Sequence, residues 1–524
     1  MNRQFLKSSF LVGGISAISA LAELFKDAVV AAFLGVTGSG DAFFVALTFP
    51  LIITGAVFQS FQISFVPLLS SAIAQKGKAE ADRMINSLIL VIGPVFVILA
   101  LGAYWAAPVL TSFIGAGLTP QMYQLSIQLC RILALSILFS GFTGLLMNWL
   151  NSNRYFAAPA SINLVRSTGM VITILLLWGH LGIFSVAVGF AVGTLAQLCV
   201  VGVSAFHRGL RLHWIRLQNW TEIKHMLVVM FWPFIMIVIR QSNTVFERFF
   251  ASYLSEGNIS ALTYSFRLVL GVVAVFSVSA FTVSLPTASQ DASVGNHQSV
   301  RDGLSAALKL VLLLALPVAT VMIVLGPEII AIVYKRGAFD VAATQMTAQL
   351  FSLYAPSLVL RAIVPLLQMP LFAYGRVKTP VIISLATYIF QIILNAILVR
   401  WLGSAALVLG DGIARFAELL ITIYFLHSVL NPILPKSFKK FALKIVAAAV
   451  TMLALLLLGR ELMHLIPFTS HLGALGSFFL VGLFGGTGFL LALWLLRVPE
   501  LELFTSGVAD RLNLTTFGQS RIKE

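Results

Sequence analysis

Charged residues are scarce in this 524-residue chain: Asp, Glu, Lys and Arg make up 10% of it, and 59% of it is hydrophobic. A soluble domain carries about 25% charged residues, so the composition excludes an ordinary soluble protein. Apolar runs of about 18 residues or more recur throughout, and each is long enough to cross a membrane. Because the runs are continuous and do not alternate, they exclude barrel strands and predict an all-α polytopic membrane protein.

Cysteine is almost absent, and so are the short motifs of enzymes. The two cysteines, Cys130 and Cys199, both lie in apolar runs, which predicts packing positions and no disulfide or metal cluster. The sequence contains no Walker loop, HExxH or CxxC motif. No loop is long enough to form a domain that would hold an active site outside the membrane. We therefore expect a transporter and not an enzyme.

The excess of positive charge, +15 in total, lies in alternate short loops. One set of loops holds Lys and Arg at 76–83, 154, 208–216, 301, 376–378 and 436–440. The opposite set holds little beyond Lys335, Arg336 and Arg460. By the positive-inside rule both termini are cytoplasmic, which requires an even number of spans. This placement argues against nucleic acid as a partner and suits anionic membrane lipids.

The sequence predicts about fourteen transmembrane helices, because Gly, Pro and charged residues separate its apolar runs at about that many places. Although Arg3, Lys7 and Ala20-Leu21-Ala22 resemble a signal peptide, the apolar character resumes at once, so we expect the first segment to remain as a helix. The predicted cores are 9–34, 41–72, 84–113, 122–152, 156–179, 182–206, 221–253, 259–288, 303–333, 341–374, 379–400, 404–430, 440–463 and 472–497.

An internal repeat divides the chain. AAFLGVTGSGDAFFVA aligns without a gap with FASYLSEGNISALTYS, and Pro67 follows Asp41 by the same 26 residues that separate Pro286 from Ser260. Parallel repeats occur in transporters whose substrate site lies between the two halves. We expect an N-lobe of six helices, a C-lobe of six helices, two extra helices and a cytoplasmic tail, over residues 1–218, 219–435, 436–498 and 499–524.

A set of ordered motifs carries a resemblance to a known family: KDAVVAAFLG with GDAFFVAL, FVPLL, NRYFAAP, ERFFASYL, YKRGAFD and GRVKTPV. Over nearly its whole length the chain resembles the MviN/MurJ-type lipid II flippases of the multidrug/oligosaccharidyl-lipid/polysaccharide exporter superfamily, as a divergent member. The resemblance implies two lobes around a central cavity and a groove on the last two helices for a polyprenyl tail. It also implies that undecaprenyl-diphosphate-linked glycans for peptidoglycan synthesis cross the bacterial cytoplasmic membrane by alternating access, without ATP.

Three charged residues, Glu23, Lys26 and Asp27, stand inside the first predicted helix. Their i,i+3 and i,i+4 spacings place them on one face. An ionisable side chain at a helix centre costs about 2.5 to 3.5 kcal/mol on insertion scales, so such residues usually face a protein interior or an aqueous cavity. We therefore expect either the charged wall of a cavity or an intrahelical ion pair that offsets the burial.

Cations inside spans are the candidate ligands for the diphosphate, since Arg binds phosphate oxygens through a bidentate fork and Lys binds them as a point charge. The resemblance assigns cavity positions to Lys26 and Arg267, but it places Ala20 and Thr54 where the family is basic. Other cations in spans are expected either to compensate or to pair structurally. These are Arg166, Arg240, Arg248 and Arg361, with Glu247, Asp411 and Glu418 as candidate partners.

Two polar residues of the second predicted helix have alternative roles. Asp41 follows a Gly-rich turn, which predicts an N-cap for that helix, while the resemblance implies a part in the outer gate, and the two roles are compatible. Gln59 stands at the family's acidic position. A neutral amide there fits the missing cation at Thr54, because removing both members of a charge pair leaves neither one unpaired.

Energy coupling is open between sodium and the membrane potential. Some relatives bind sodium with an acidic residue and an Asn–Asp pair. Glu247 and Asn395 supply part of such a site, whereas Val399, one turn beyond Asn395, offers no carboxylate. No other cofactor or metal is expected.

Three transport functions remain in competition. The first is a flippase for lipid II, and the second is a flippase for a capsule, O-antigen or exopolysaccharide repeat unit, which the uncharged Ala20 and Thr54 favour. The third is a cation-coupled drug antiporter, against which the two extra helices argue, because twelve helices are usual there. We expect a monomer, with glycan polymerase machinery as a candidate partner.

Overall fold

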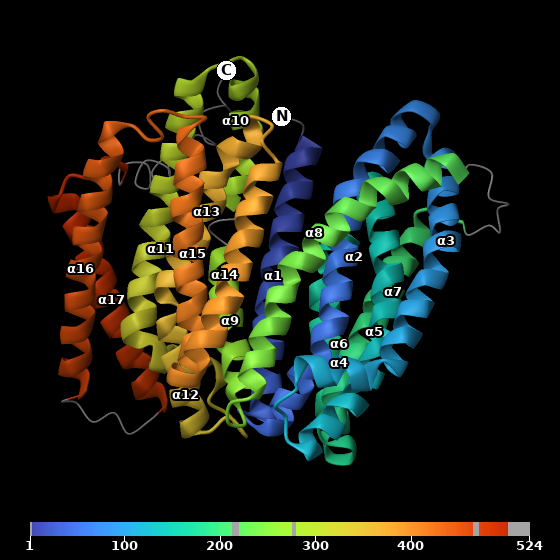
Figure 1. Cartoon of the computed structure of the whole chain (residues 1–524), viewed down its shortest axis with the longest axis horizontal. Helices are drawn as coiled ribbons and strands as arrows, with labels where there is room; N and C mark the ends of the chain where they lie inside the picture. The colour runs from blue at the N-terminus through green and yellow to red at the C-terminus, as the bar shows by residue number, and fades with distance from the viewer. Residues whose placement is uncertain (1–2, 212–219, 275–278, 465–470, 501–524) are drawn as a thin grey trace, which may run out of the picture. The chain divides into compact units, whose positions relative to one another are not determined.

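The computed structural model describes residues 3–211, 220–274, 279–464 and 471–500, and its regular structure in these ranges is entirely helical (Figure 1). Within them, eleven helices are long and apolar enough to cross a membrane. The helices are α1 (Arg3–Leu34), α2 (Gly38–Lys76), α3 (Lys78–Trp105), α4 (Ala107–Ile114), α5 (Pro120–Ser152), α6 (Ala157–Leu181), α7 (Phe184–His207), α8 (Trp220–Ser252), α9 (Asn258–Val273), α10 (Ser279–Ser293), α11 (His297–Tyr334), α12 (Val341–Leu353), α13 (Ala355–Ala373), α14 (Lys378–Leu402), α15 (Ser404–His427), α16 (Lys436–His464) and α17 (His471–Leu495).

Two segments that the sequence predicts as single helices are each divided in two. The segment 84–113 becomes α3 and α4, and 341–374 becomes α12 and α13. In a third segment, 259–288, the structure describes α9 and α10, and residues 275–278 between them lie outside the described part. Pro108 and Pro356 stand in the first turns of α4 and α13. Proline is favoured at that place, since its missing N–H would have no partner there anyway. These prolines therefore begin new helices where the sequence analysis expected continuous ones.

The chain forms two compact units. The first contains residues 1–264, 333–344 and 395–404, and the second contains 265–332, 345–394 and 405–524. In the first unit, Phe61, Phe65, Phe96 and Trp149 belong to a buried cluster between α2, α3 and α5. In the second unit, a separate buried cluster joins α11 to α16 and α17. In each cluster, apolar side chains pack long helices side by side. The buried charged residues described below lie outside these clusters.

In each unit, a basic side chain near the start of one helix donates a hydrogen bond to a backbone carbonyl just after another helix. In the first unit, Lys78 Nζ, at the start of α3, donates to the carbonyl of Arg208 at 2.6 Å, just after α7. In the second unit, Arg301 Nε, near the start of α11, donates to the carbonyl of Pro432 at 2.7 Å, after α15. The same kind of contact thus occurs once in each unit.

Candidate functional site

The charged face of α1 contributes to an ion network in the first unit. Lys26 Nζ lies 3.1 Å from Asp27 Oδ1 and 3.7 Å from Glu23 Oε1. Arg166 Nη2, on α6, donates to Glu23 Oε1 at 3.1 Å. Lys26 and Asp27 are buried, whereas the Glu23 side chain is 40% exposed. The predicted shared face is therefore present, and each of its carboxylates lies within 4 Å of a cation.

The other candidate diphosphate ligands lie in different surroundings. Arg248 is buried on α8, where its Nη1 donates to the carbonyl of Phe44 and to Thr48 Oγ1 on α2. This guanidinium fastens α8 to α2. Arg267 is half-buried on α9, while Arg240 lies on α8 with its side chain outside the described part of the structure.

The remaining polar candidates of the first unit lie on α2, α8 and α14. On α2, Thr54 is buried and Gln59 is exposed. Glu247 is half-buried on α8. Asn395 is buried on α14, and its Oδ1 has no hydrogen-bond partner among the described residues. Within those residues, no group of three His, Cys, Asp or Glu side chains is placed to hold a metal ion.

Asp41 binds the start of α9 and not the start of its own helix. Its Oδ2 accepts from the N–H of Gly257, and its Oδ1 accepts from the N–H and Oγ of Ser260, each at 2.7 Å. The N-cap of α2 is Thr37, whose Oγ1 accepts from the N–H of Gly40. The prediction that Asp41 caps the second helix is therefore wrong. Its carboxylate instead satisfies N–H groups at the positive end of α9.

Glycine allows the close approach around Asp41. Gly257 has a φ of +92°, and a Cβ there would lie 2.8 Å from Val36 Cγ1. Nearby, the N–H of Ala338 donates to the carbonyl of Ala32 at 2.7 Å. The ends of α1 and α8, the starts of α2 and α9, and the chain around residue 338 are thereby joined through backbone and short polar groups.

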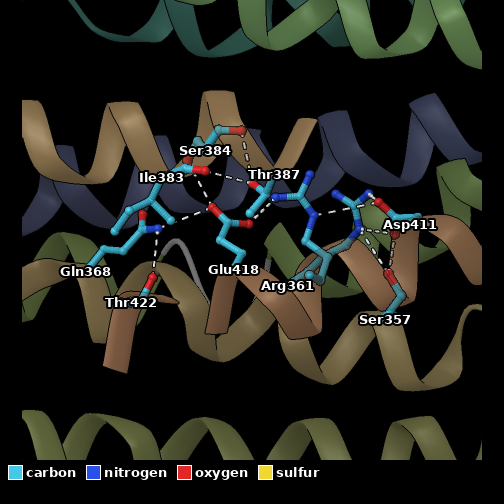
Figure 2. A network of polar contacts seen from close by, with 10 residues as sticks. Ser357, Arg361, Gln368, Ile383, Ser384, Thr387, Asp411, Glu418 and Thr422 are labelled. Atoms are coloured by element: carbon cyan, nitrogen blue, oxygen red, sulfur yellow. Dashed lines mark hydrogen bonds and ion pairs between the residues drawn. The ribbon is translucent and has the colours of Figure 1, made fainter. Parts of the chain in front are cut away.

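The second unit contains a buried polar network on α13, α14 and α15 (Figure 2). Asp411 accepts from Arg361 through both oxygens, with Nη2 2.5 Å from Oδ1 and Nε 3.2 Å from Oδ2. Ser357 Oγ also donates to Asp411 Oδ2. Arg361, which is only partly buried, stacks its guanidinium 4.8 Å from the ring centroid of Phe266 on α9. Asp411 therefore fixes the orientation of Arg361.

Arg415 continues the network from Asp411 to Glu418. Its Nε lies 3.6 Å from Asp411 Oδ1, and its Nη1 pairs with Glu418 Oε2. Glu418 Oε1 accepts from Gln368 Nε2 at 3.2 Å and from Ser384 Oγ at 2.9 Å. The two Arg and two acidic residues sum to zero charge. Each carboxylate has several donors, as a buried charge requires.

The sequence analysis identified Arg361 with Asp411 or Glu418 as a structural alternative, and the structure confirms the pairing with Asp411. It missed Arg415, although Asp411, Arg415 and Glu418 follow one another at i,i+4 and i,i+3 spacing. This spacing on a helix predicts ion pairs and was available in the sequence. Gln368 and Ser384 lie on other helices, so no local signal marked them as partners.

A protein-family model matches most of this chain. The family model described as "Lipid II flippase MurJ" matches residues 30–484. A probable lipid II flippase MurJ of Thermotoga maritima is 25% identical over 506 residues, covering 92% of this chain and 95% of the relative. A probable lipid II flippase MurJ of Buchnera aphidicola subsp. Baizongia pistaciae is 25% identical over 473 residues, covering 87% and 90%.

Solved structures agree with this result. One described as "Lipid II flippase MurJ, inward closed conformation" has a TM-score of 0.77 and 25% identity, covering 92% of this chain and 98% of that chain. An inward-facing multidrug resistance MATE family transporter of the MOP superfamily has a TM-score of 0.66 at 14% identity, covering 79% and 96%. The second likeness concerns the fold alone.

Proposed function

Because this chain belongs to the MurJ family of lipid II flippases, we propose that it carries lipid II, an undecaprenyl-diphosphate-linked precursor of peptidoglycan, across the bacterial inner membrane by alternating access. The match of the family model over nearly the whole chain is the observation that carries this proposal. The protein is a transporter and not an enzyme. We further propose that it acts as a monomer and passes its cargo to glycan polymerase machinery.

The proposed architecture has fourteen spans, with both termini in the cytoplasm. This count treats α3 with α4, α9 with α10, and α12 with α13 as one span each. The lobes would comprise residues 1–218 and 219–435, followed by helices over 436–498 and a tail over 499–524. The recurrence of the Lys78–Arg208 contact as the Arg301–Pro432 contact supports a parallel repeat. The α16–α17 pair would hold the polyprenyl tail.

The proposed diphosphate ligands are Lys26 and Arg267, assisted by Arg240, Arg248 and Arg361. Lys26 already has carboxylate partners in Glu23 and Asp27. Binding of a diphosphate at Lys26 would therefore require an exchange of partners. The exposed Glu23 is best placed to release it, because a carboxylate in contact with water loses less free energy on separation than a buried one does.

Asp41 with the start of α9 is the proposed outer gate. Three hydrogen bonds from Gly257 and Ser260 converge on this carboxylate. Hydrogen bonds to a charged group contribute about 1.5 to 3 kcal/mol each. Opening of such a gate would break these polar contacts and would not require disruption of an apolar core.

The membrane potential and sodium remain the proposed driving forces. Moving one elementary charge across 100 mV is worth about 2.3 kcal/mol. With the cytoplasm negative, outward movement of a diphosphate is favoured, because it carries negative charge away from the negative side. Sodium coupling would involve Glu247 and Asn395.

We predict that Lys26→Ala and Arg267→Ala each weaken binding of lipid II by about 10-fold or more, since each removes a charge-assisted contact with the diphosphate. Native mass spectrometry of the purified protein with added lipid II measures this directly. Lys436→Ala, which removes an exposed cation at the start of α16, is the matched control and should leave binding unchanged. Unaltered binding in both test variants would remove Lys26 and Arg267 from the site.

One observation favours a second cargo. Ala20 and Thr54 are uncharged at two positions where the resemblance implies basic residues. A capsule, O-antigen or exopolysaccharide repeat unit shares the lipid diphosphate and differs in its glycan. The same binding experiment with such a repeat unit in place of lipid II distinguishes the two cargoes.

A further inference from the structure

Helix α11 of the second unit is broken near its end. Leu325 has φ −105° and ψ 17°, which are not helical values, and Gly326 and Pro327 follow it. Proline has no N–H to donate to the carbonyl four residues earlier, and its ring crowds that turn. The sequence analysis predicted an uninterrupted helix over 303–333. The break is a correction to that prediction, and it exposes backbone groups inside a membrane segment, where they need other partners.

Side chains from two other helices bind carbonyls beside this break. Ser352 Oγ, on α12, donates to the carbonyl of Met322 at 2.9 Å. Arg460 Nη1, on α16, donates to the carbonyl of Val324 at 3.1 Å. The Nε of the same Arg460 lies 3.4 Å from Glu328 Oε1. Because Val324 precedes the break and Glu328 follows it, a single guanidinium holds both sides of it.

A second polar contact joins α11 to the α16–α17 pair nearer the start of α11, well before the break. Lys309 Nζ lies 2.6 Å from Glu500 Oε1, just after α17, and 5.5 Å from the ring centroid of Phe441 on α16. Between the two polar contacts, a continuous buried cluster joins the helices. Its members include Leu313, Val324 and Leu325 of α11 and Ile445, Met452 and Leu456 of α16. The undivided helix α16 therefore packs along the part of α11 that precedes the break, and its Arg460 reaches Glu328 in the part that follows.

We propose that Arg460 and Glu328 are positioning residues that hold the break in α11 and couple its angle to the position of the α16–α17 pair. The coupling to transport rests on the proposed function, in which α16 and α17 hold the polyprenyl tail. Through Arg460, a tail that shifts α16 would change the bend of α11, a helix of the second unit.

Hydrogen–deuterium exchange in lipid nanodiscs tests, without any substrate, whether Arg460 holds the break in α11. Arg460→Met keeps the apolar stem and removes the donors, so we expect the amides of residues 322–328 to exchange about 10-fold faster or more, since a hydrogen bond from a charged donor is lost. Arg460→Lys keeps the charge without the fork and should be intermediate. Glu461→Gln removes an adjacent, exposed charge and is the matched control, with exchange as in the wild type.

Flipping of lipid II in proteoliposomes tests the positioning role. Arg460→Met should lower the flipping rate by about 10-fold or more and leave the dissociation constant for lipid II within about 2-fold, because the binding groups are intact. If Arg460→Met fails to fold, Glu328→Gln removes the ion pair with little change of shape and should shift both measurements in the same direction.

Two results would overturn the proposal: unchanged exchange at 322–328 in Arg460→Met, or faster exchange with an unchanged flipping rate. A wild-type protein that does not flip lipid II would contradict the proposed cargo. In that event the exchange comparison still decides whether Arg460 holds the break, so the two failures are distinguishable.

Discussion

Arg361 shows how a buried partner decides what an intramembrane cation does. Taken alone, it is a fork-shaped donor suited to a diphosphate. In the structure, both oxygens of Asp411 bind two of its nitrogens, and Phe266 supports the plane of its guanidinium. A buried ion pair contributes little net stability, but removal of one partner leaves an uncompensated charge. The orientation of Arg361 is thus a property of the pair.

We predict that Arg361→Met and Asp411→Asn each lower the free energy of unfolding by about 3 to 5 kcal/mol, as removal of one member of a buried pair does. The double variant should recover part of that loss, because neither charge is then left unpaired. Thermal unfolding of the detergent-solubilised variants, analysed as a double-mutant cycle, gives the coupling. Strictly additive losses would show that the two residues act independently.

Residue-scale contacts differ in how far the sequence predicts them. The contact of Lys26 with Glu23 follows from i,i+3 spacing and is confirmed. The contact of Glu23 with Arg166 joins residues 143 apart, and that of Asp41 with Gly257 joins residues 216 apart. Local periodicity fixes which face a side chain occupies. The partner across that face depends on packing between helices, which a single sequence does not encode locally.

At the scale of helices, proline marks most of the departures from prediction. Pro108 and Pro356 begin new helices, and Pro327 follows the break in α11. Proline inside α2, at Pro50 and Pro67, leaves that helix continuous. The residue type alone therefore does not decide the outcome. In α11, the nearby donors Ser352 and Arg460 satisfy the carbonyls beside the break.

The turn before α9 contains Gly257, whose close contact with Val36 leads to a prediction about stability. Gly257→Ala should lower the free energy of unfolding by about 2 to 4 kcal/mol, because alanine is strained at this positive φ and its Cβ would press on Val36. Gly295→Ala is the matched control: its φ is +74° but no atom lies within 4 Å of the added Cβ. It should cost only about 1 kcal/mol. Equal losses in thermal unfolding would show that the contact with Val36 is unimportant.

At the scale of the whole molecule, composition and charge distribution predicted the all-helical membrane class, and ordered motifs predicted the family. Both are confirmed. The assignment of ligands stays a prediction, because Lys26, Arg248 and Arg361 all have protein partners in this structure. Alternating access requires such contacts to change between conformations. The sequence shows which residues are charged, whereas the residues that they contact depend on the conformation.

Removal of α16 and α17 tests whether they are needed for transport and not only for folding. Truncation after Pro435 also removes Glu500 and leaves Lys309 without that partner, so the truncated chain should carry Lys309→Met. We expect the remaining helices to fold and transport to fall by about 10-fold or more, since the tail loses its apolar contacts and the break in α11 loses Arg460. Circular dichroism checks the folding, and flipping in proteoliposomes checks the transport. Transport at the wild-type rate would contradict a tail-binding role.

Complementation tests the central claim most directly. In a bacterium depleted of its own lipid II flippase, expression of this chain should restore growth. The double variant Lys26→Ala/Arg267→Ala, present in the membrane at the same level, should not. Growth restored by the wild type and lost in the variant is the result expected of a lipid II flippase that uses these cations. Failure of the wild type to restore growth, despite good expression in the membrane, would contradict lipid II as the cargo.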